Sequence, residues 1–109
     1  MNITTSTLGT GIKVAIDGRI DTTNYNEFEQ LAEKLFGEGV KTIYLDCSKL
    51  SYISSSGLRI FLSIQKRMMA AEGKFLLYGM QPGIKEIFDI SGFSSVFTIF
   101  DSEAEALID

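Results

Sequence analysis

The sequence contains no histidine, the side chain that most often serves as a general base near neutral pH. A Ser-His-Asp triad therefore cannot be assembled from this chain. A zinc site would have to be built from one cysteine and carboxylates, which is a poor ligand set for this metal. The chain also lacks a P-loop and a Gly-rich dinucleotide-binding pattern. We therefore predict no catalytic residues, no cofactor and no metal site, and a protein that is not an enzyme.

Cysteine and long apolar runs are also scarce. Cys47 is the single cysteine, so an intramolecular disulfide is impossible, and we predict that it is a small buried hydrophobic residue in a strand. Residues 1–20 are polar and interrupted by glycines, which is unlike a signal peptide. No apolar run approaches the ~20 residues of a membrane span. We therefore expect a cytoplasmic protein without direct membrane insertion.

Basic residues are fewer than acidic ones, at 10 Lys and Arg against 14 Asp and Glu, which gives a net charge of −4. Nucleic-acid binding requires a surface rich in Lys and Arg, so we do not expect a nucleic-acid partner. The length of 109 residues and the 45% of hydrophobic residues suit one domain with one core. We therefore predict a single domain over residues 1–109.

The first part of the chain predicts a β-hairpin. Residues 2–8 are β-rich, residues 9–11 form a glycine-containing turn, and residues 12–17 alternate between apolar and polar side chains. Residues 18–21 are expected to form a loop. Further strands are predicted at 42–47, 74–78 and 96–100, and residues 48–55 are expected to be a second loop.

Helices are predicted between these strands from apolar residues at helical spacing. The first covers residues 24–36, with Thr22 or Thr23 as its N-cap, and the second covers residues 56–71. A third begins at Pro82. Ser102 is predicted to cap a short fourth helix, whose inward-facing residues would be Ala104, Leu107 and Ile108.

The resulting order is β-β-α-β-α-β-α-β-α, which predicts an α/β fold. Strands that alternate with helices form parallel neighbours through right-handed crossovers. We therefore expect a mixed, mostly parallel sheet of about five strands with an N-terminal hairpin and about four helices. The methionines and four aromatic residues are assigned to the core: Tyr52, Phe61, Phe75 and Phe88.

A cluster of serines at the start of the second helix is the strongest functional signal. Ser54, Ser55 and Ser56 are followed by Gly57, and the backbone N–H groups of a helix start favour an anion. A phosphate there would add about −1.5 to −2 units of charge and could block a partner. Alternatively, the serines only cap the helix. Both interpretations hold if one serine caps the helix while its neighbour is exposed.

The residues around the cluster also have two interpretations. Arg59, Lys66 and Arg67 lie along the second helix, either as an ordinary solvated face or as a partner-binding edge. Gly57 is small enough to allow a partner or a phosphate to approach closely.

The stretch from Leu50 to Leu58, Leu-Ser-Tyr-Ile-Ser-Ser-Ser-Gly-Leu, resembles the central motif of STAS domains, the family of bacterial anti-sigma factor antagonists. The usual motif opens a helix with Asp-Ser-Ser/Thr-Gly-Leu. Residues 18–21, Gly-Arg-Ile-Asp, are similar to the family's Gly-x-Leu/Ile-Asp loop. Residues 88–93 are similar to its Phe-x-x-x-Gly-Leu/Phe segment. The resemblance covers essentially the whole chain.

This resemblance implies a STAS-like fold and a function by partner switching. The domain would bind an anti-sigma factor that is also a serine kinase, and this binding would release the sigma factor. Phosphorylation of one serine would inactivate the domain, and a PP2C-type phosphatase would restore it. By resemblance the acceptor is Ser55, with Ser54 at the position of the usual Asp. Ser54 and Ser56 are the alternative acceptors.

The resemblance also implies where the partner binds. Asp21 matches the loop Asp that lies near the serine site in the family. The expected partner-binding residues are Asp21, Ser54, Ser55, Ser56, Gly57 and Arg59. A second interpretation is a STAS subunit of a transport or signalling assembly that works without phosphorylation.

Overall fold

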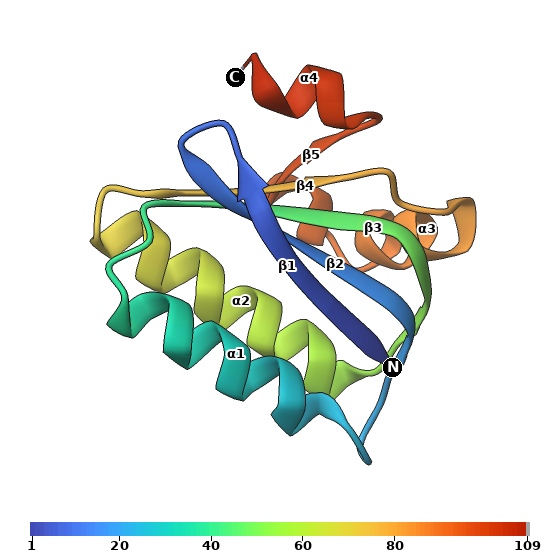
Figure 1. Ribbon diagram of the computed structural model, residues 1–109. Coiled ribbons are helices and arrows are strands. Elements are labelled where there is room, and N and C mark those ends of the chain that lie inside the picture. The colour runs from blue at the N-terminus through green and yellow to red at the C-terminus, as the bar shows by residue number, and fades with distance from the viewer. Residues whose placement is uncertain (109) are drawn as a thin grey trace.

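The computed structural model describes residues 1–108 and is built on a five-stranded sheet in the order β1-β2-β3-β4-β5 (Figure 1). The N-terminal hairpin pairs its two strands antiparallel, and each later strand runs parallel to its neighbour. The predicted mixed, mostly parallel sheet is thus confirmed. The strands are β1 (Asn2–Leu8), β2 (Gly11–Ile20), β3 (Thr42–Ile53), β4 (Lys74–Tyr78) and β5 (Thr98–Phe100).

Helices cover the two faces of this sheet unequally. One face carries the main core, to which three helices contribute, and α1 and α2 lie side by side beneath it (Figure 1). The opposite face carries a small cluster that includes one residue of the fourth helix. Within residues 1–108, no helix is both long and apolar enough to cross a membrane. The helices are α1 (Tyr25–Gly37), α2 (Ser55–Ala70), α3 (Pro82–Ile90) and α4 (Glu103–Leu107).

Phe61 of α2 lies at the centre of the main core and is fully buried. The rings of four phenylalanines surround it at centroid distances of 5.4 to 6.4 Å. Offset and edge-to-face pairs of this kind add stability beyond the burial of area. The core assignment of Phe61, Phe75 and Phe88 is therefore confirmed. The neighbours are Phe28, Phe75, Phe88 and Phe97.

Cys47 is fully buried in β3, as predicted. Burial raises the pKa of its thiol well above the usual value, so the thiol stays protonated and unreactive. This residue therefore contributes to packing.

The two predicted loops at 18–21 and 48–55 are largely strand, which corrects the expectation from the sequence. β2 continues to Ile20 and β3 to Ile53, and these two residues still pair with each other. Register shifts between Ala15 and Asp17 and between Gly18 and Arg19 break the alternation of polar and apolar residues. This alternation is the signal that predicts strands, so the last residues of the two strands were not predicted to be strand.

Two large side chains assigned to the core are exposed. Tyr52 is 38% exposed near the end of β3, and Met69 is 68% exposed on the outer side of α2. Both lie next to buried residues in the chain, Ile53 and Met68. The assignment was wrong because it followed residue type, whereas the strand and the helix turn these two side chains away from the sheet core.

The starts of two elements and the buried residue of a third also differ from expectation. Residues 93–95 form a 3-10 helix, so the last strand starts at Thr98 and not at residue 96. The first helix starts after Asn24, because Thr23 binds Asp21 and is part of the preceding turn. In α4 the buried residue is Ala106. The residues predicted to face inward are exposed: Ala104, Leu107 and Ile108.

Replacement of Phe61 by alanine tests the centre of the core. We expect Phe61→Ala to lower the free energy of unfolding by about 3–5 kcal/mol, because it removes a buried ring and leaves a cavity. Urea denaturation measures this change. Met69→Ala, on the same helix but exposed, should stay within about 0.5 kcal/mol of the wild type. A loss below about 1 kcal/mol for Phe61→Ala would place the core centre elsewhere.

Candidate functional site

The serine cluster lies where β2 and β3 end together. The last paired residues are Ile20 and Ile53, and the N–H of Ser54 donates a hydrogen bond of 2.8 Å to the carbonyl oxygen of Ile20. Asp21 follows Ile20 just as Ser54 follows Ile53. The structure thus brings Asp21 and the serines to the same end of the sheet, where the loops that follow parallel strands lie.

Ser54 is the N-cap of α2. Its backbone is extended, and its Oγ accepts a hydrogen bond of 3.2 Å from the N–H of Gly57. The residue is 8% exposed. Aspartate and serine are about equally good N-caps, because either supplies an oxygen acceptor. The serine that replaces the family's usual Asp therefore keeps the helix start intact.

Ser55 is the first residue of α2 and is exposed, whereas Ser56 is half-buried. The N–H groups in the first turn of a helix have no acceptor within the helix, and the helix dipole makes this end positive. The Ser55 hydroxyl is thus the most accessible of the three. The structure thus confirms that a serine caps the helix while its neighbour is exposed, and phosphorylation of Ser55 stays a prediction.

Gly57 holds α2 close to the sheet. It is buried, and a Cβ at this position would lie 2.8 Å from Cγ2 of Ile20 and 2.8 Å from Cγ1 of Ile53. A side chain would push the helix start away from the two strand ends. The small size of Gly57 therefore serves packing, and its contact with a partner stays a prediction.

The loop after β2 is held by side-chain hydrogen bonds. Asp21 accepts bonds from the hydroxyl of Thr23 at 2.6 Å and from its N–H at 2.9 Å, and these bonds lower the pKa of Asp21. Asn24 closes the loop, because its Oδ1 accepts from the N–H of Asp21 and its Nδ2 donates to the carbonyl of Arg19. Asp21 is therefore an anion in a defined loop beside the serines.

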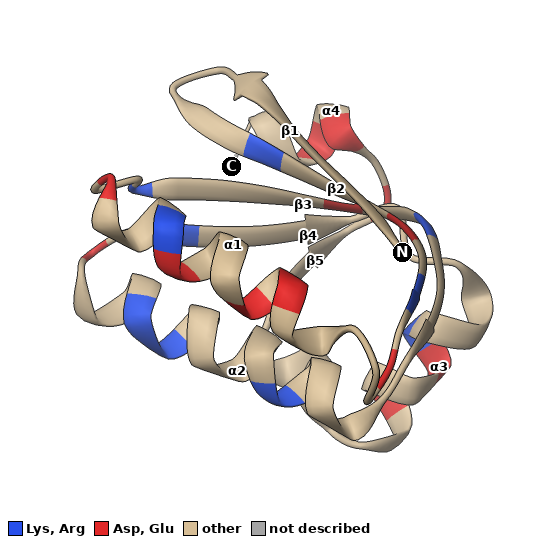
Figure 2. Cartoon of the chain, turned by 60° about the horizontal axis from the view of Figure 1, so that its bottom comes forward, with Lys and Arg blue, Asp and Glu red and all other residues tan. Residues whose placement is uncertain are grey.

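Basic side chains follow the serines along α2, although the whole chain is acidic. The helix carries Arg59, Lys66 and Arg67 and no acidic residue, whereas α1 carries mainly acidic ones (Figure 2). Arg59 is exposed and lines a hollow of about 350 Å³. Ser56 also lines it, so the hollow adjoins the serine cluster. The remaining lining residues are Tyr25, Glu29, Ile60 and Ser63.

One pair of residues at this end of the sheet was missed from the sequence. Arg19 and Tyr52 are partners in the β2–β3 register, and the guanidinium of Arg19 lies 4.2 Å from the centroid of the Tyr52 ring. Their proximity follows only from the strand ends that the sequence did not predict. The register shift between Gly18 and Arg19 breaks the alternation of polar and apolar residues, and this alternation is the sequence signal from which the pairing of Arg19 with Tyr52 could have been predicted.

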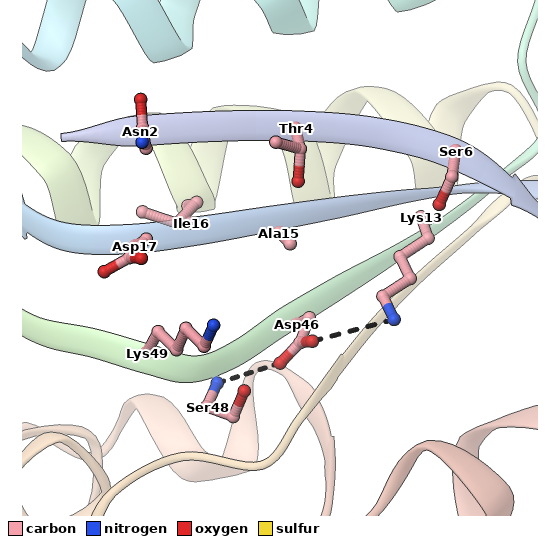
Figure 3. A pocket seen from close by; sticks show the side chains of 10 residues that line it. All are labelled: Asn2, Thr4, Ser6, Lys13, Ala15, Ile16, Asp17, Asp46, Ser48 and Lys49. Atoms are coloured by element: carbon pink, nitrogen blue, oxygen red, sulfur yellow. Dashed lines mark hydrogen bonds and ion pairs between the residues drawn. The ribbon is translucent and has the colours of Figure 1, made fainter.

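A second polar hollow, of about 310 Å³, lies on the other side of the sheet over the first three strands (Figure 3). Lys13 projects from β2, and its Nζ lies 3.8 Å from Oδ2 of Asp46 and 2.9 Å from Oε2 of Glu103. The hydroxyl of Tyr78 donates to the same Glu103 oxygen at 2.8 Å. These contacts attach α4 to the sheet, so the polar groups here have a structural role.

The attachment of α4 predicts a pH dependence of stability. Hydrogen bonds from Lys13 and then Tyr78 lower the pKa of Glu103 from its usual 4.5. Its ionised form therefore contributes stability above pH 4.5, and this contribution is lost as the pH falls through the lowered pKa. We expect wild type to be more stable than Glu103→Gln at neutral pH, with the difference shrinking in acid.

Denaturant unfolding at several pH values measures this difference. Glu105→Gln, on the same helix but outside the cluster, is the control and should follow the wild type. A constant difference between wild type and Glu103→Gln across the acid range would contradict the assigned role.

Substitution of the capping serine gives a second test. We expect Ser54→Ala to lower the free energy of unfolding by about 1 kcal/mol, because the N–H of Gly57 loses its acceptor. Ser54→Asp should restore most of this loss. Ser55→Ala removes an exposed hydroxyl and should stay within about 0.5 kcal/mol of wild type. If Ser55→Ala proves the more costly of the two in thermal or urea unfolding, the cap has been assigned to the wrong serine.

Comparison with known proteins gives concordant matches. The STAS domain family model matches residues 2–106. A Bordetella bronchiseptica protein with the provisional name anti-sigma factor antagonist BtrV is 29% identical over 106 residues, which cover 97% of this chain and 91% of that protein. The anti-sigma-B factor antagonist of Staphylococcus aureus is 24% identical over 99 residues, which cover 91% of this chain and 92% of that protein.

The structure is also similar to a solved one. The phosphorylated form of the Bacillus cell fate determinant SpoIIAA matches with a TM-score of 0.76 at 20% identity, over 98% of this chain and 97% of that one. The two chains therefore share a fold, from the N-terminal hairpin to the last helix.

Proposed function

The chain belongs to the STAS domain family, and from this premise we propose that it is an anti-sigma factor antagonist controlled by phosphorylation of Ser55. It binds an anti-sigma factor that is also a serine kinase, and this binding releases the sigma factor. Phosphorylation by the bound kinase ends the interaction, and a PP2C-type phosphatase restores the active form. The exchange takes place in the cytoplasm, where the sigma factor acts.

The observation that carries this proposal is the different exposure of neighbouring serines. Ser54 is buried and its Oγ accepts the hydrogen bond of the helix cap, while Ser55 is an exposed residue at the first position of α2. A kinase must reach the acceptor hydroxyl, and the structure favours Ser55 for this role. The names of the two curated relatives support the same class of function.

The position of Ser55 also explains how a phosphate could act as a switch without refolding the domain. The dianion would lie at the positive end of α2, where free N–H groups and the dipole stabilise it. It would add about −1.5 to −2 units of charge to the docking surface. A partner surface complementary to Arg59, the basic residue of α2 that lies beside the serines, is acidic, so the added charge would repel it.

Mass spectrometry after incubation with ATP and the serine kinase encoded nearest to this gene tests the proposal. We expect one added phosphate, mapped to Ser55, and none on Ser55→Ala. Ser63→Ala removes another exposed serine of α2 and is the matched control, which should be phosphorylated like the wild type. Full phosphorylation of Ser55→Ala would move the acceptor to Ser54 or Ser56.

Binding of the kinase to Ser55→Asp tests the switch itself. The carboxylate supplies part of the phosphate's charge, so we expect at least about tenfold weaker binding, equivalent to about 1.4 kcal/mol. Calorimetry measures the affinity, with Ser6→Asp, an exposed serine of β1 on the other side of the sheet, as the control. If Ser55→Asp binds as tightly as wild type, the domain works without phosphorylation, as a subunit of a transport or signalling assembly.

A further inference from the structure

We propose that Arg19 and Tyr52 together form a docking point for an acidic side chain of the anti-sigma factor, and that this point determines which anti-sigma factor is accepted. This inference rests on the proposed function and adds residues that the serine motif does not contain. The partner group is an Asp or Glu carboxylate.

The geometry prepares Arg19 for such a contact. Its guanidinium lies 4.2 Å from the ring centroid of Tyr52, its Nε lies 4.0 Å from Oδ2 of Asp21, and its carbonyl accepts from Asn24. The side chain is nevertheless 61% exposed. An arginine held in place by an aromatic ring loses less conformational freedom on binding, and its planar donors fit a carboxylate. The pair is therefore ordered and still accessible.

The location connects the pair to the serine switch. Ile53 and Ser54 alone separate Tyr52 from Ser55 along the chain, and Arg19 lies near the end of β2, just before the loop that contains Asp21. A partner that covers Ser55 would reach this end of the β2–β3 pair. Exposed Tyr and Arg side chains are the residue types that most often dominate binding energy at interfaces.

The charges of the residues around the pair indicate that the partner's surface is acidic. Beside the serine cluster, the exposed Arg59 lines a hollow together with Ser56, and α2 carries no acidic residue in a chain whose net charge is −4. A surface of this sign selects an acidic partner and rejects a basic one through like-charge repulsion. Arg19 therefore adds a second exposed basic side chain, besides Arg59, at the end of the molecule that carries the serines.

A second Arg–aromatic pair in the chain provides a matched control. The guanidinium of Arg67 lies 3.9 Å from the ring centroid of Phe36, and its Nη1 forms an ion pair of 2.6 Å with Glu33. This pair has the same chemistry and similar exposure, but it lies near the C-terminal ends of α1 and α2, away from Ser55. If the Arg19–Tyr52 contact served stability alone, substitutions in both pairs should affect binding equally little.

The experiment measures the affinity of the nearest encoded anti-sigma factor/serine kinase for the full chain and its variants. We expect Arg19→Ala and Tyr52→Ala to bind on the order of 30-fold more weakly, the size of a ~2 kcal/mol interface hot spot. Tyr52→Phe keeps the ring and should bind within about threefold of wild type. Arg67→Ala should bind within about twofold. Thermal unfolding of each variant shows that its fold is intact.

Two further readouts separate docking from a structural role. Arg19→Ala should raise the KM for phosphorylation of Ser55 and leave kcat unchanged, as expected for loss of ground-state binding. Arg19→Glu should reject the wild-type kinase, and one Asp→Arg or Glu→Arg variant of the kinase should restore binding. That exchange would identify the carboxylate directly.

The outcomes distinguish this inference from the proposed function. If wild type binds the kinase and Ser55→Asp does not, while Arg19→Ala and Tyr52→Ala bind like wild type, the docking point is refuted and the proposed function stands. The docking point is also refuted if Arg19→Ala binds weakly but no Asp→Arg or Glu→Arg variant of the kinase restores binding to Arg19→Glu. If wild type binds no anti-sigma factor, both fail.

Discussion

The close contact between α2 and the paired ends of β2 and β3 is the constraint on which the candidate site depends. Gly57 lies against Ile20 and Ile53 with no room for a Cβ, and the N–H of Ser54 donates to the carbonyl of Ile20. These contacts fix the first turn of α2 relative to the loop that contains Asp21. The serines are therefore presented by a rigid junction of two strands and a helix, and a phosphate on Ser55 would change the charge of this surface while its backbone stays in place.

Charge distribution determines what this surface can bind. The chain as a whole is acidic, yet the charged residues of the helix that starts at Ser55 are all basic, and Arg19 adds another basic residue near the end of β2. The net charge of the chain therefore differs in sign from the charged residues of this helix, and it is a poor guide to the partner of the proposed surface. Under the proposed function, one phosphate on Ser55 would oppose the attraction of an acidic partner without a conformational change.

Much of the fold was predictable because the signals are local. Apolar spacing located the helices, and the serine–glycine motif located the start of α2 and the exposed neighbour of a capping serine. The strand ends were not predictable, since register shifts in β2 break the alternation that identifies strands. The pairing of Arg19 with Tyr52 depends on these ends, so it is a property of the tertiary structure. Tyr52 was assigned to the core from its side-chain type. The direction in which its side chain points depends on the irregular β2–β3 pairing, which the sequence does not show.

The serine at position 54 has a consequence beyond capping. An Asp in this place would cap α2 equally well, but it would hold a negative charge beside the acceptor. With Ser54 neutral, a phosphate on Ser55 would meet no repulsion from position 54, and the unphosphorylated surface carries one negative charge fewer than it would with Asp at that position. Asp21 is then the anion that remains beside the serines. Under the proposed function, recognition by the kinase would draw on other charged groups near the serine, and Arg19, which lies against the Tyr52 ring and is exposed to solvent, is the group that we propose for that role.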